Sequence, residues 1–505
     1  MKYRSNVSQM TQVHEQIRVF FEPRSVAIVG ASRDASKAGH VIFKNFVENK
    51  KRGSFKGELY AVNPTEQSIL GYPCYPSVLN VPGELDLMTV VIPARFVPKV
   101  MGDAAKKGVK AAVVISSGFG EIGEKELEEQ VRKTALQSGM RLLGPNCLGI
   151  FDSYTGVDML FLPETKVLST GDEMIATPRP MPGYITVVTQ SGAFGPAALD
   201  FLTGRHIGIS KMISFGNKAD VSEPEILSYL LEDDRTKVIL QYVEGINKGR
   251  EFLEVARKVT LRKPIVTLKS GRTTAGARAA ASHTGSLSGS DAIYDGAFRQ
   301  AGIIRVKDIE EFFDVAKAFV YQPPAAGENI AILTDAGGPG VMCADEIESR
   351  GMRINPLPNE TLQRFEELKK SGEIPSFAAT RNPVDLTGSA TSEMFESCTR
   401  VLLEESAVHG ITIVGIHHVP ALKEDFVDRI AKVVNGHTKP VVACDIGETE
   451  MALYVRGRFE KLGIPCYETP EDAARAIVAL VKYGKHLREN DCYERYVKEF
   501  TARSR

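Results

Sequence analysis

The sequence predicts an α/β protein made of several doubly wound parallel sheets in series. Short β-branched and apolar runs alternate with helical patterns over most of the 505 residues. Strands that read as continuous apolar runs and are separated by helices are typical of parallel sheets covered on both faces. The expected strands cover residues 25–29, 59–62, 88–92, 111–115, 185–189, 211–214, 238–242, 264–269, 330–334, 410–415 and 440–443.

Two breaks in this alternation indicate three domains. Residues 151–183 lose the pattern and contain four prolines, so they are expected to form a linker or a pocket-forming excursion. The stretch 322–327 combines paired prolines with small residues, which interrupt both helix and strand. The sequence therefore predicts domains at 19–150, 184–322 and 328–485.

The composition excludes several classes of protein. The formal net charge is −1 without a long basic block, so nucleic acid is not expected as the main partner. No apolar run reaches the length of a membrane span, and residues 1–22 lack the apolar core of a secretory signal. Seven scattered cysteines without a C-x-x-C pair predict reduced thiols, with no zinc site. We therefore expect a cytoplasmic protein with no metal site of its own.

The turn after the first strand is a candidate phosphate-binding element. Gly30, Ala31 and Ser32 follow the strand directly, and Lys37 stands shortly before the next helical pattern. A glycine turn lets backbone N–H groups approach a phosphate at the helix N-terminus, and a lysine adds positive charge. The spacing is not G-x-G-x-x-G, which argues against a nicotinamide cofactor.

Further candidate ligand residues follow the other strands of the first domain. They are Asn63 with Pro64, Pro93, Ser117 and, after a fifth strand, Asn146. Open parallel sheets bind ligands at the carboxyl ends of their strands, where all these residues are expected to gather. The neighbouring Cys147 is interpreted as a packed thiol.

Two later strand-to-helix turns are candidate anion sites. One turn contains Gln190, Ser191, Gly192 and Ala193, and the other contains Gly337 and Gly338. Each aims backbone N–H donors and the positive end of a helix at one point. In the second turn Asp335 is compatible with phosphate only if its carboxylate faces away.

A histidine and a carboxylate complete the pattern. His283 lies in a small-residue stretch, 280–289, interpreted as a flexible loop, and Glu244 ends the strand that begins at residue 238. A carboxylate can fix the tautomer of an imidazole, and the imidazole can then act as a nucleophile. Two helix N-termini that converge on one phosphate could stabilise phosphohistidine. The combination therefore predicts phosphoryl transfer through His283 rather than hydride chemistry.

On these residues the chain resembles the nucleoside-diphosphate-forming acyl-CoA synthetases, the superfamily of succinyl-CoA synthetase and ADP-forming acetate–CoA ligase. The resemblance covers about residues 19–480, and its most specific motifs are Ser282-His283-Thr284-Gly285, Gln190-Ser191-Gly192-Ala193, Gly144-Pro145-Asn146-Cys147 and Asn382-Pro383-Val384-Asp385. It implies a CoA-binding Rossmann-like domain followed by two flavodoxin-like ligase domains.

The resemblance also implies roles for the motif residues. Coenzyme A binds at the positions that match Gly30-Ala31-Ser32, Lys37 and Asn63-Pro64. The histidine matching His283 is phosphorylated, and the carboxylate matching Glu244 orients it. The helices after Ser191 and Gly338 hold the phosphate.

No stretch resembles the ATP-grasp domains of this superfamily. The resemblance therefore implies an α subunit with an ATP-grasp β subunit as partner, which would bind ATP or ADP and Mg²⁺. The implied reaction is acyl-CoA + phosphate + ADP giving acid + CoA + ATP, reversibly. Residues 155–183 match no pattern of the family, so the carboxylic acid is not specified.

Two other functions remain alternatives at this point. One is a CoA-binding regulatory module, or a module associated with a protein acyltransferase, without ligase activity. Such a sensor needs neither His283 nor Glu244, which argues against it. The other is an NAD-dependent dehydrogenase, which the missing G-x-G-x-x-G disfavours.

Overall fold

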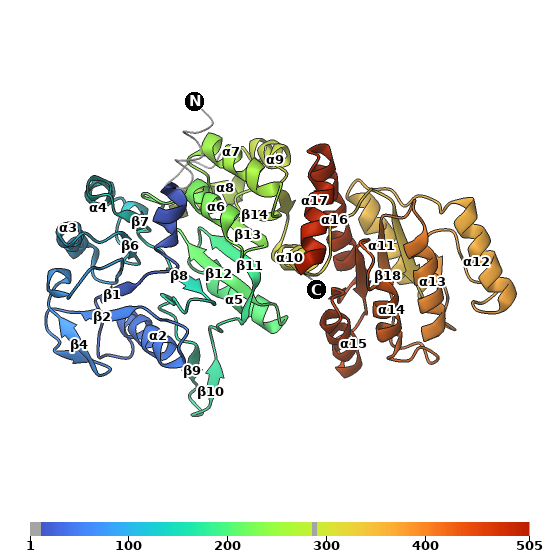
Figure 1. Ribbon diagram of the computed structural model, residues 1–505, viewed down its shortest axis with the longest axis horizontal. Coiled ribbons are helices and arrows are strands. Elements are labelled where there is room, and N and C mark those ends of the chain that lie inside the picture. The colour runs from blue at the N-terminus through green and yellow to red at the C-terminus, as the bar shows by residue number, and fades with distance from the viewer. Residues whose placement is uncertain (1–11, 285–289, 504–505) are drawn as a thin grey trace. The chain divides into compact units, whose positions relative to one another are not determined.

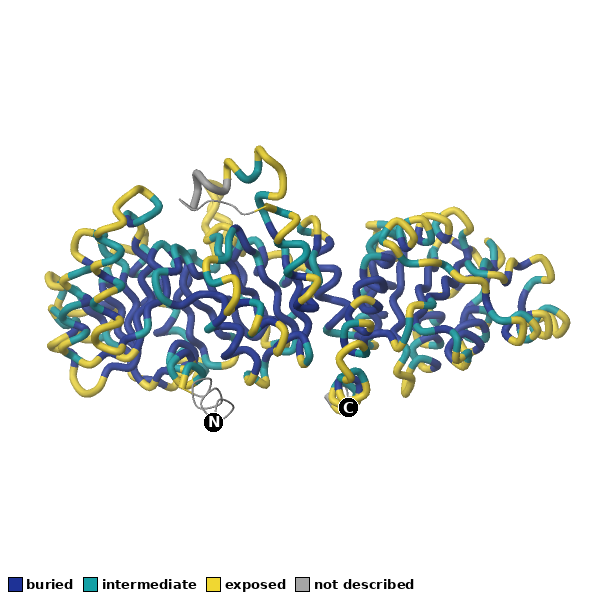
Figure 2. Tube along the Cα trace, turned by 90° about the horizontal axis from the view of Figure 1, so that it is seen from above, coloured by how far each residue is buried: buried dark blue, intermediate teal, exposed yellow. Residues whose placement is uncertain are grey.

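The computed structural model describes residues 12–284 and 290–503, and from Ala280 to Thr284 it describes the backbone alone. By their internal contacts the residues form two compact units, the first ending at Arg305 and the second beginning at Val306. Figure 1 shows the elements of each unit, and Figure 2 shows buried segments in the interior of each unit with exposed segments around them. The predicted α/β class with parallel sheets is confirmed.

The first unit begins with a seven-stranded sheet in the order β3-β4-β2-β1-β5-β6-β7. All its neighbouring strands are parallel except β3 and β4. The strands are β1 (Ser25–Val29), β2 (Glu58–Val62), β3 (Ser68–Ile69), β4 (Tyr72–Tyr75), β5 (Leu87–Val90), β6 (Ala111–Val114) and β7 (Arg141–Leu143). The helices are α2 (Ala38–Arg52), α3 (Val97–Lys107) and α4 (Lys125–Ser138). Because β2 and β5 flank β1, the strand order reverses at β1, and such a reversal opens a crevice at the carboxyl ends of the strands.

A second sheet in this unit has the order β15-β14-β13-β11-β12-β8. Its strands are β8 (Ile150–Asp152), β11 (Pro182–Thr189), β12 (Ile209–Ser214), β13 (Val238–Val243), β14 (Ile265–Lys269) and β15 (Ile304–Val306). The helices are α5 (Phe194–Gly204), α6 (Glu223–Glu232), α7 (Gly249–Thr260), α8 (Thr274–Thr284) and α9 (Asp291–Gln300). The 151–183 excursion begins with β8, which pairs antiparallel with β12, and contains a hairpin of β9 (Thr165–Val167) and β10 (Glu173–Ile175).

One hydrophobic core joins the two sheets of the first unit. Phe43 and Phe46 of α2 belong to the same buried cluster as Ile213 of β12 and Phe252 of α7. Each of these side chains is at most 1% exposed. The continuous apolar core explains why these two sheets form one compact unit.

The second unit contains a five-stranded parallel sheet in the order β17-β16-β18-β19-β20. Its strands are β16 (Ile330–Thr334), β17 (Val384–Asp385), β18 (Gly410–Val414), β19 (Val441–Cys444) and β20 (Cys466–Tyr467). The helices are α10 (Ile309–Tyr321), α11 (Gly337–Ser349), α12 (Asn359–Ser371), α13 (Ser392–Glu404), α14 (Phe426–Val434), α15 (Glu450–Lys461), α16 (Pro470–Glu489) and α17 (Tyr493–Arg503). Among the residues that the structure describes, no helix is both long and apolar enough to cross a membrane.

Candidate active site

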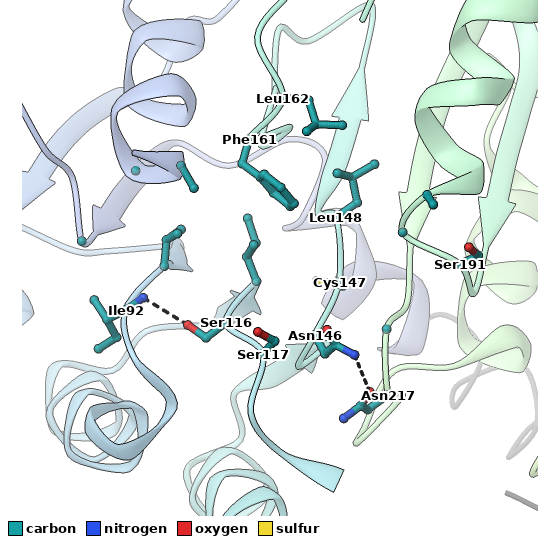
Figure 3. A pocket seen from close by; sticks show the side chains of 18 of the residues that line it. Ile92, Ser116, Ser117, Asn146, Cys147, Leu148, Phe161, Leu162, Ser191 and Asn217 are labelled. Carbon is teal, nitrogen blue, oxygen red and sulfur yellow. Dashed lines mark hydrogen bonds between the residues drawn. The ribbon is translucent and has the colours of Figure 1, made fainter. Parts of the chain in front are cut away.

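A cavity of about 1120 Å³ lies in the first unit at the strand ends of both sheets. Its walls come from the β1 turn, the loops after β5, β6 and β7, and the turns after β11, β12 and β13. In Figure 3, Ile92 and Ser116, from the loops after β5 and β6, lie on the left, and Ser191, from the turn after β11, lies on the right. Phe161 and Leu148 lie between them. The excursion after β8 thus contributes an aromatic side chain to the cavity.

The β1 turn is shaped for close backbone approach. Gly30 has φ of 95°, and a Cβ there would lie 2.2 Å from the carbonyl oxygen of Val91. A Cβ on Gly39 would lie 2.0 Å from the carbonyl oxygen of Gly30. Only glycine therefore allows the turn to pack against both β5 and the start of α2. Ser32 and Lys37 line the cavity at this turn, with Lys37 at the N-cap of α2.

Asn63 braces the same turn. Its Nδ2 donates to the Ala31 carbonyl at 2.8 Å, and its Oδ1 accepts from the N–H and the hydroxyl of Thr65, both at 2.9 Å. Asn63 lines the cavity, whereas Ala31 is completely buried and Pro64 is not among the lining residues. In this structure the amide side chain of Asn63 holds the backbone rather than reaching into open space.

The other predicted residues that follow strands of the first sheet lie together at one cavity, as their position after parallel strands predicts. Pro93, Ser117 and Asn146 all line the cavity. Asn146 has φ of 56° and donates through Nδ2 to Oδ1 of Asn217 at 3.2 Å, which links the first sheet to the loop after β12 (Figure 3). Cys147 also lines the cavity, and burial raises the pKa of its thiol to about 12, which fits the interpretation of a packed thiol.

The turn after β11 forms the opposite wall. Gln190, Ser191, Gly192 and Ala193 all line the cavity, and α5 begins directly after them. The side-chain Oε1 of Gln190 accepts the backbone N–H groups of Glu244 and Gly245 at 3.0 and 3.1 Å.

Glu244 follows β13 and lines the same cavity, with its residue 7% exposed. The neighbouring Ile246 donates its N–H to the Tyr294 hydroxyl at 3.2 Å. The described structure therefore brings Glu244 and the β11 turn to one wall.

His283 belongs to the last turn of α8. The interpretation of 280–289 as one loop is wrong for its first five residues, because the alanine-rich stretch before His283 has high helix propensity. The His283 side chain and residues 285–289 lie outside the described residues.

Gly337 and Gly338 open helix α11 of the second unit and are exposed. The Thr334 hydroxyl accepts the N–H of Ala336 at 3.0 Å, just as the Thr189 hydroxyl accepts that of Ser191 at 3.1 Å. Both turns are therefore built in the same way.

Asp335 in the second of these turns faces away from the helix start. Its carboxylate accepts the N–H of Ile416, after β18, at 3.1 Å. Burial, aided by the charges of Asp445 and Asp385, raises the pKa of Asp335 to about 7. The Asp335 carboxylate is thus held by the backbone after β18, whereas the Asp385 carboxylate lies close to Gly337, where an added Cβ would be 2.9 Å from its Oδ2.

Several cavity residues were not expected from the sequence. They include Leu148, Phe161, Leu162, Pro196, Gly216, Asn217, Lys218 and Asn247. The proline-rich excursion signalled the contribution of Phe161 and Leu162, but no local pattern marks Asn217 or Lys218. Within residues 12–284 and 290–503, no group of three or more His, Cys, Asp or Glu side chains is arranged to hold a metal ion.

Three family models match successive parts of the chain. They are a CoA binding domain over residues 24–152, a succinyl-CoA ligase like flavodoxin domain over 182–319, and a ligase-CoA domain over 330–486. Together they include all three sheets described above.

Two curated relatives are similar over nearly the whole chain. The chain is 39% identical to the acetate–CoA ligase [ADP-forming] II subunit alpha of Pyrococcus furiosus, over 93% of this chain and 98% of that protein. It is 37% identical to an acetate–CoA ligase [ADP-forming] of Methanocaldococcus jannaschii, over 95% of this chain but only 65% of that protein.

A solved structure is similar over the same extent. The dinucleotide forming acetyl-coenzyme A synthetase 1 of Ca. Korarchaeum cryptofilum, in complex with phosphate and ADP, shares 36% identity with a TM-score of 0.84. The match covers 94% of this chain and 99% of that chain.

Proposed function

Because this chain belongs to the nucleoside-diphosphate-forming acyl-CoA synthetase family, we propose that it is the α subunit of an ADP-forming acid–CoA ligase of the acetate–CoA ligase type. The reaction is acyl-CoA + phosphate + ADP to carboxylic acid + CoA + ATP, and it is reversible. The observation that carries the proposal is that one and the same cavity is lined by the β1 turn, the β11 turn and Glu244.

In this proposal coenzyme A binds along the first sheet. The N–H groups of the Gly30 turn, the Ser32 hydroxyl and the Lys37 ammonium receive its phosphates. Asn63 holds that turn in shape, and the loops of Pro93, Ser117 and Asn146 contact the pantetheine arm. The acyl group then points toward Gln190–Ala193, with Phe161 and Leu148 as apolar neighbours.

The chemistry proceeds through two exchanges. An oxygen of phosphate attacks the acyl carbonyl carbon, the C–S bond breaks, and CoA leaves as the thiolate to give an acyl phosphate. A ring nitrogen of His283 then attacks phosphorus, and the carboxylate leaves. The N–H groups at the start of α5 stabilise the phosphoryl charge, and Glu244 holds the imidazole in the tautomer that can attack.

A partner subunit is part of the proposal. The chain spans 98% of a relative named as a subunit alpha but 65% of a relative whose name gives no subunit. We assign ATP or ADP and Mg²⁺ to an ATP-grasp β subunit that receives the phosphoryl group from His283, so the enzyme is a hetero-oligomer. Gly337 and Gly338 contribute a second phosphate-binding helix start in this proposal.

The proposal keeps the three-domain division at 19–150, 184–322 and 328–485. A cytoplasmic location is also proposed, since all seven cysteines are free thiols in the structure. The carboxylic acid is left to experiment, because the relatives include proteins named acetate–CoA ligase, 4-hydroxybutyrate–CoA ligase and trans-feruloyl-CoA synthase.

The deciding experiment incubates the purified chain with labelled phosphate and a panel of acyl-CoAs. We expect acid-labile, alkali-stable label that is absent from the His283→Ala variant, and the acyl-CoA that gives the fastest labelling identifies the substrate. The assay is repeated with ADP and the co-purified ATP-grasp protein, which should convert the label to ATP. If acyl-CoA binds but neither label nor ATP forms in either arrangement, the chain is a CoA-binding module instead.

A further inference from the structure

The loop after β12 connects the two walls of the cavity. A Cβ on Gly216 would lie 2.1 Å from the carbonyl oxygen of Pro145, so only glycine permits this approach to the first sheet. The N–H groups of Asn217 and Ala219 donate to the carbonyls of Pro145 and Gly144 at 2.9 and 3.0 Å. The loop is therefore fastened along the end of β7.

The Asn217 side chain strengthens this attachment. Its Nδ2 donates to carboxylate oxygens of Glu121 and Glu128, each at 2.7 Å. Burial opposes ionisation of Glu121, but the hydrogen bonds from Asn217 and Gly118 outweigh it and lower the pKa of Glu121. The attachment thus includes charge-assisted hydrogen bonds.

The next residue, Lys218, faces the second sheet. Its ammonium donates to the carbonyl oxygen of Gly245 at 2.6 Å and to Oε1 of Glu223 at 2.9 Å. The Lys218 and Glu223 side chains are 3% and 2% exposed, and Lys218 adopts φ of 59°. A buried ion pair and a left-handed non-glycine residue are both unfavourable by themselves, and such features concentrate at functional sites.

The contact with Gly245 completes the bracing of the segment that presents Glu244. Gln190 accepts the N–H groups of Glu244 and Gly245, Tyr294 accepts that of Ile246, and Lys218 donates to the Gly245 carbonyl. Four backbone polar groups of three consecutive residues are thus held by three side chains. Removing one of them frees the peptide next to Glu244.

We infer that Lys218 is a positioning residue that holds Glu244 for the reaction and joins its segment to the CoA-binding sheet. The inference rests on the proposed function. Lys218 acts through the Gly245 carbonyl, so its loss should slow the chemical steps without weakening the binding of acyl-CoA. Misplacement of a catalytic group by about 1 Å can lower a rate by about 100-fold.

The test compares Lys218→Met with Lys263→Met in the full chain assayed with its ATP-grasp partner. Lys263 is a matched control because it is also a buried lysine in a loop next to the second sheet. It binds the backbone carbonyls of Leu230 and Asp233 and is not among the residues that line the cavity. For Lys218→Met we expect kcat for ATP formation to fall about 100-fold while KM for acyl-CoA changes by no more than about twofold. Lys218→Arg, which keeps the charge and a donor, should recover at least about tenfold of that loss.

The outcomes separate the two ideas. If the wild type forms no ATP from any acyl-CoA, the proposed function fails. If the wild type is active and Lys218→Met loses no more kcat than Lys263→Met, or if KM rises as much as kcat falls, only the positioning role fails. If Lys218→Met does not fold, Glu223→Gln is assayed in its place, because this variant removes the charge that pairs with Lys218 at nearly constant side-chain volume. It should lower kcat about tenfold at unchanged KM, and wild-type kcat would overturn the inference.

Discussion

The side-chain oxygen of Gln190 accepts two successive backbone N–H groups, those of Glu244 and Gly245, at 3.0 and 3.1 Å. Gln190 belongs to the turn that opens α5, so this contact ties the proposed phosphate-binding turn to the proposed orienting carboxylate. A single amide thereby fixes the spacing of two sites that the proposed reaction uses together.

Replacement of Gln190 by alanine should therefore impair turnover more than folding. Two partly buried N–H groups lose their acceptor, each at a cost of up to about 1–3 kcal/mol, and the Glu244 segment is released. We expect kcat to fall about 100-fold, measured as ATP formation from acyl-CoA, phosphate and ADP. Gln190→Glu is the control, since it keeps the acceptor oxygen but places negative charge at the turn. It should retain stability and raise KM for phosphate, and an Ala variant with full turnover would contradict the bracing role.

Gly30→Ala should abolish tight CoA binding. The added Cβ would lie 2.2 Å from the Val91 carbonyl, so the turn must shift away from the cavity wall. Gly71→Ala is a matched control with φ of 84° and no atom near the added Cβ. The control should cost only about 1 kcal/mol of unfolding free energy and leave CoA affinity unchanged. Calorimetric titration with CoA should show a loss of more than about tenfold for Gly30→Ala, and equal affinities for the two variants would refute the steric argument.

Cys147 should behave as a packing residue. With its pKa raised to about 12 by burial, the thiol carries almost no thiolate at neutral pH. Iodoacetamide should leave Cys147 unmodified in the folded protein and alkylate it after unfolding, as followed by peptide mass spectrometry. Cys147→Ala should keep kcat within about threefold of the wild type, and a larger drop at unchanged stability would indicate a chemical role.

Asp335 should make the second unit less stable as the pH rises. Its native pKa, raised to about 7 from the ordinary value of 3.8, means that the unfolded chain ionises first. The stabilising contribution is therefore complete below about pH 4 and is lost progressively up to about pH 7. Asp335→Asn, which still offers an oxygen to the Ile416 N–H, removes this dependence. The difference in unfolding free energy between variant and wild type should grow by a few kcal/mol, at most about 4, between pH 4 and pH 8 in denaturant titrations. A constant difference would show that the carboxyl is not protonated in the native state.

Much of the architecture was predictable because it is locally encoded. Apolar runs such as Ile330–Thr334 form parallel strands where helices cover both faces of the sheet. The turn at Gly30 is recognisable because only glycine fits its positive φ and its close approach to the Val91 carbonyl. The gathering of Pro93, Ser117 and Asn146 followed from one rule, that parallel strands share a carboxyl edge.

The limits of local reasoning appear at particular residues. The small side chains before His283 suggest a loop, but the alanines among them favour helix, and α8 continues to Thr284. Phe161 lies in a segment with no regular pattern, and its place in the cavity depends on how β8 pairs with β12.

The sequence by itself determined the fold class, the strands and most strand-end residues of the cavity, because these depend on neighbours a few positions away. Only the tertiary structure decided that the first two sheets share one core and that Lys218 meets Gly245. Those contacts join residues that are distant in the sequence, so no local pattern of side chains could reveal them.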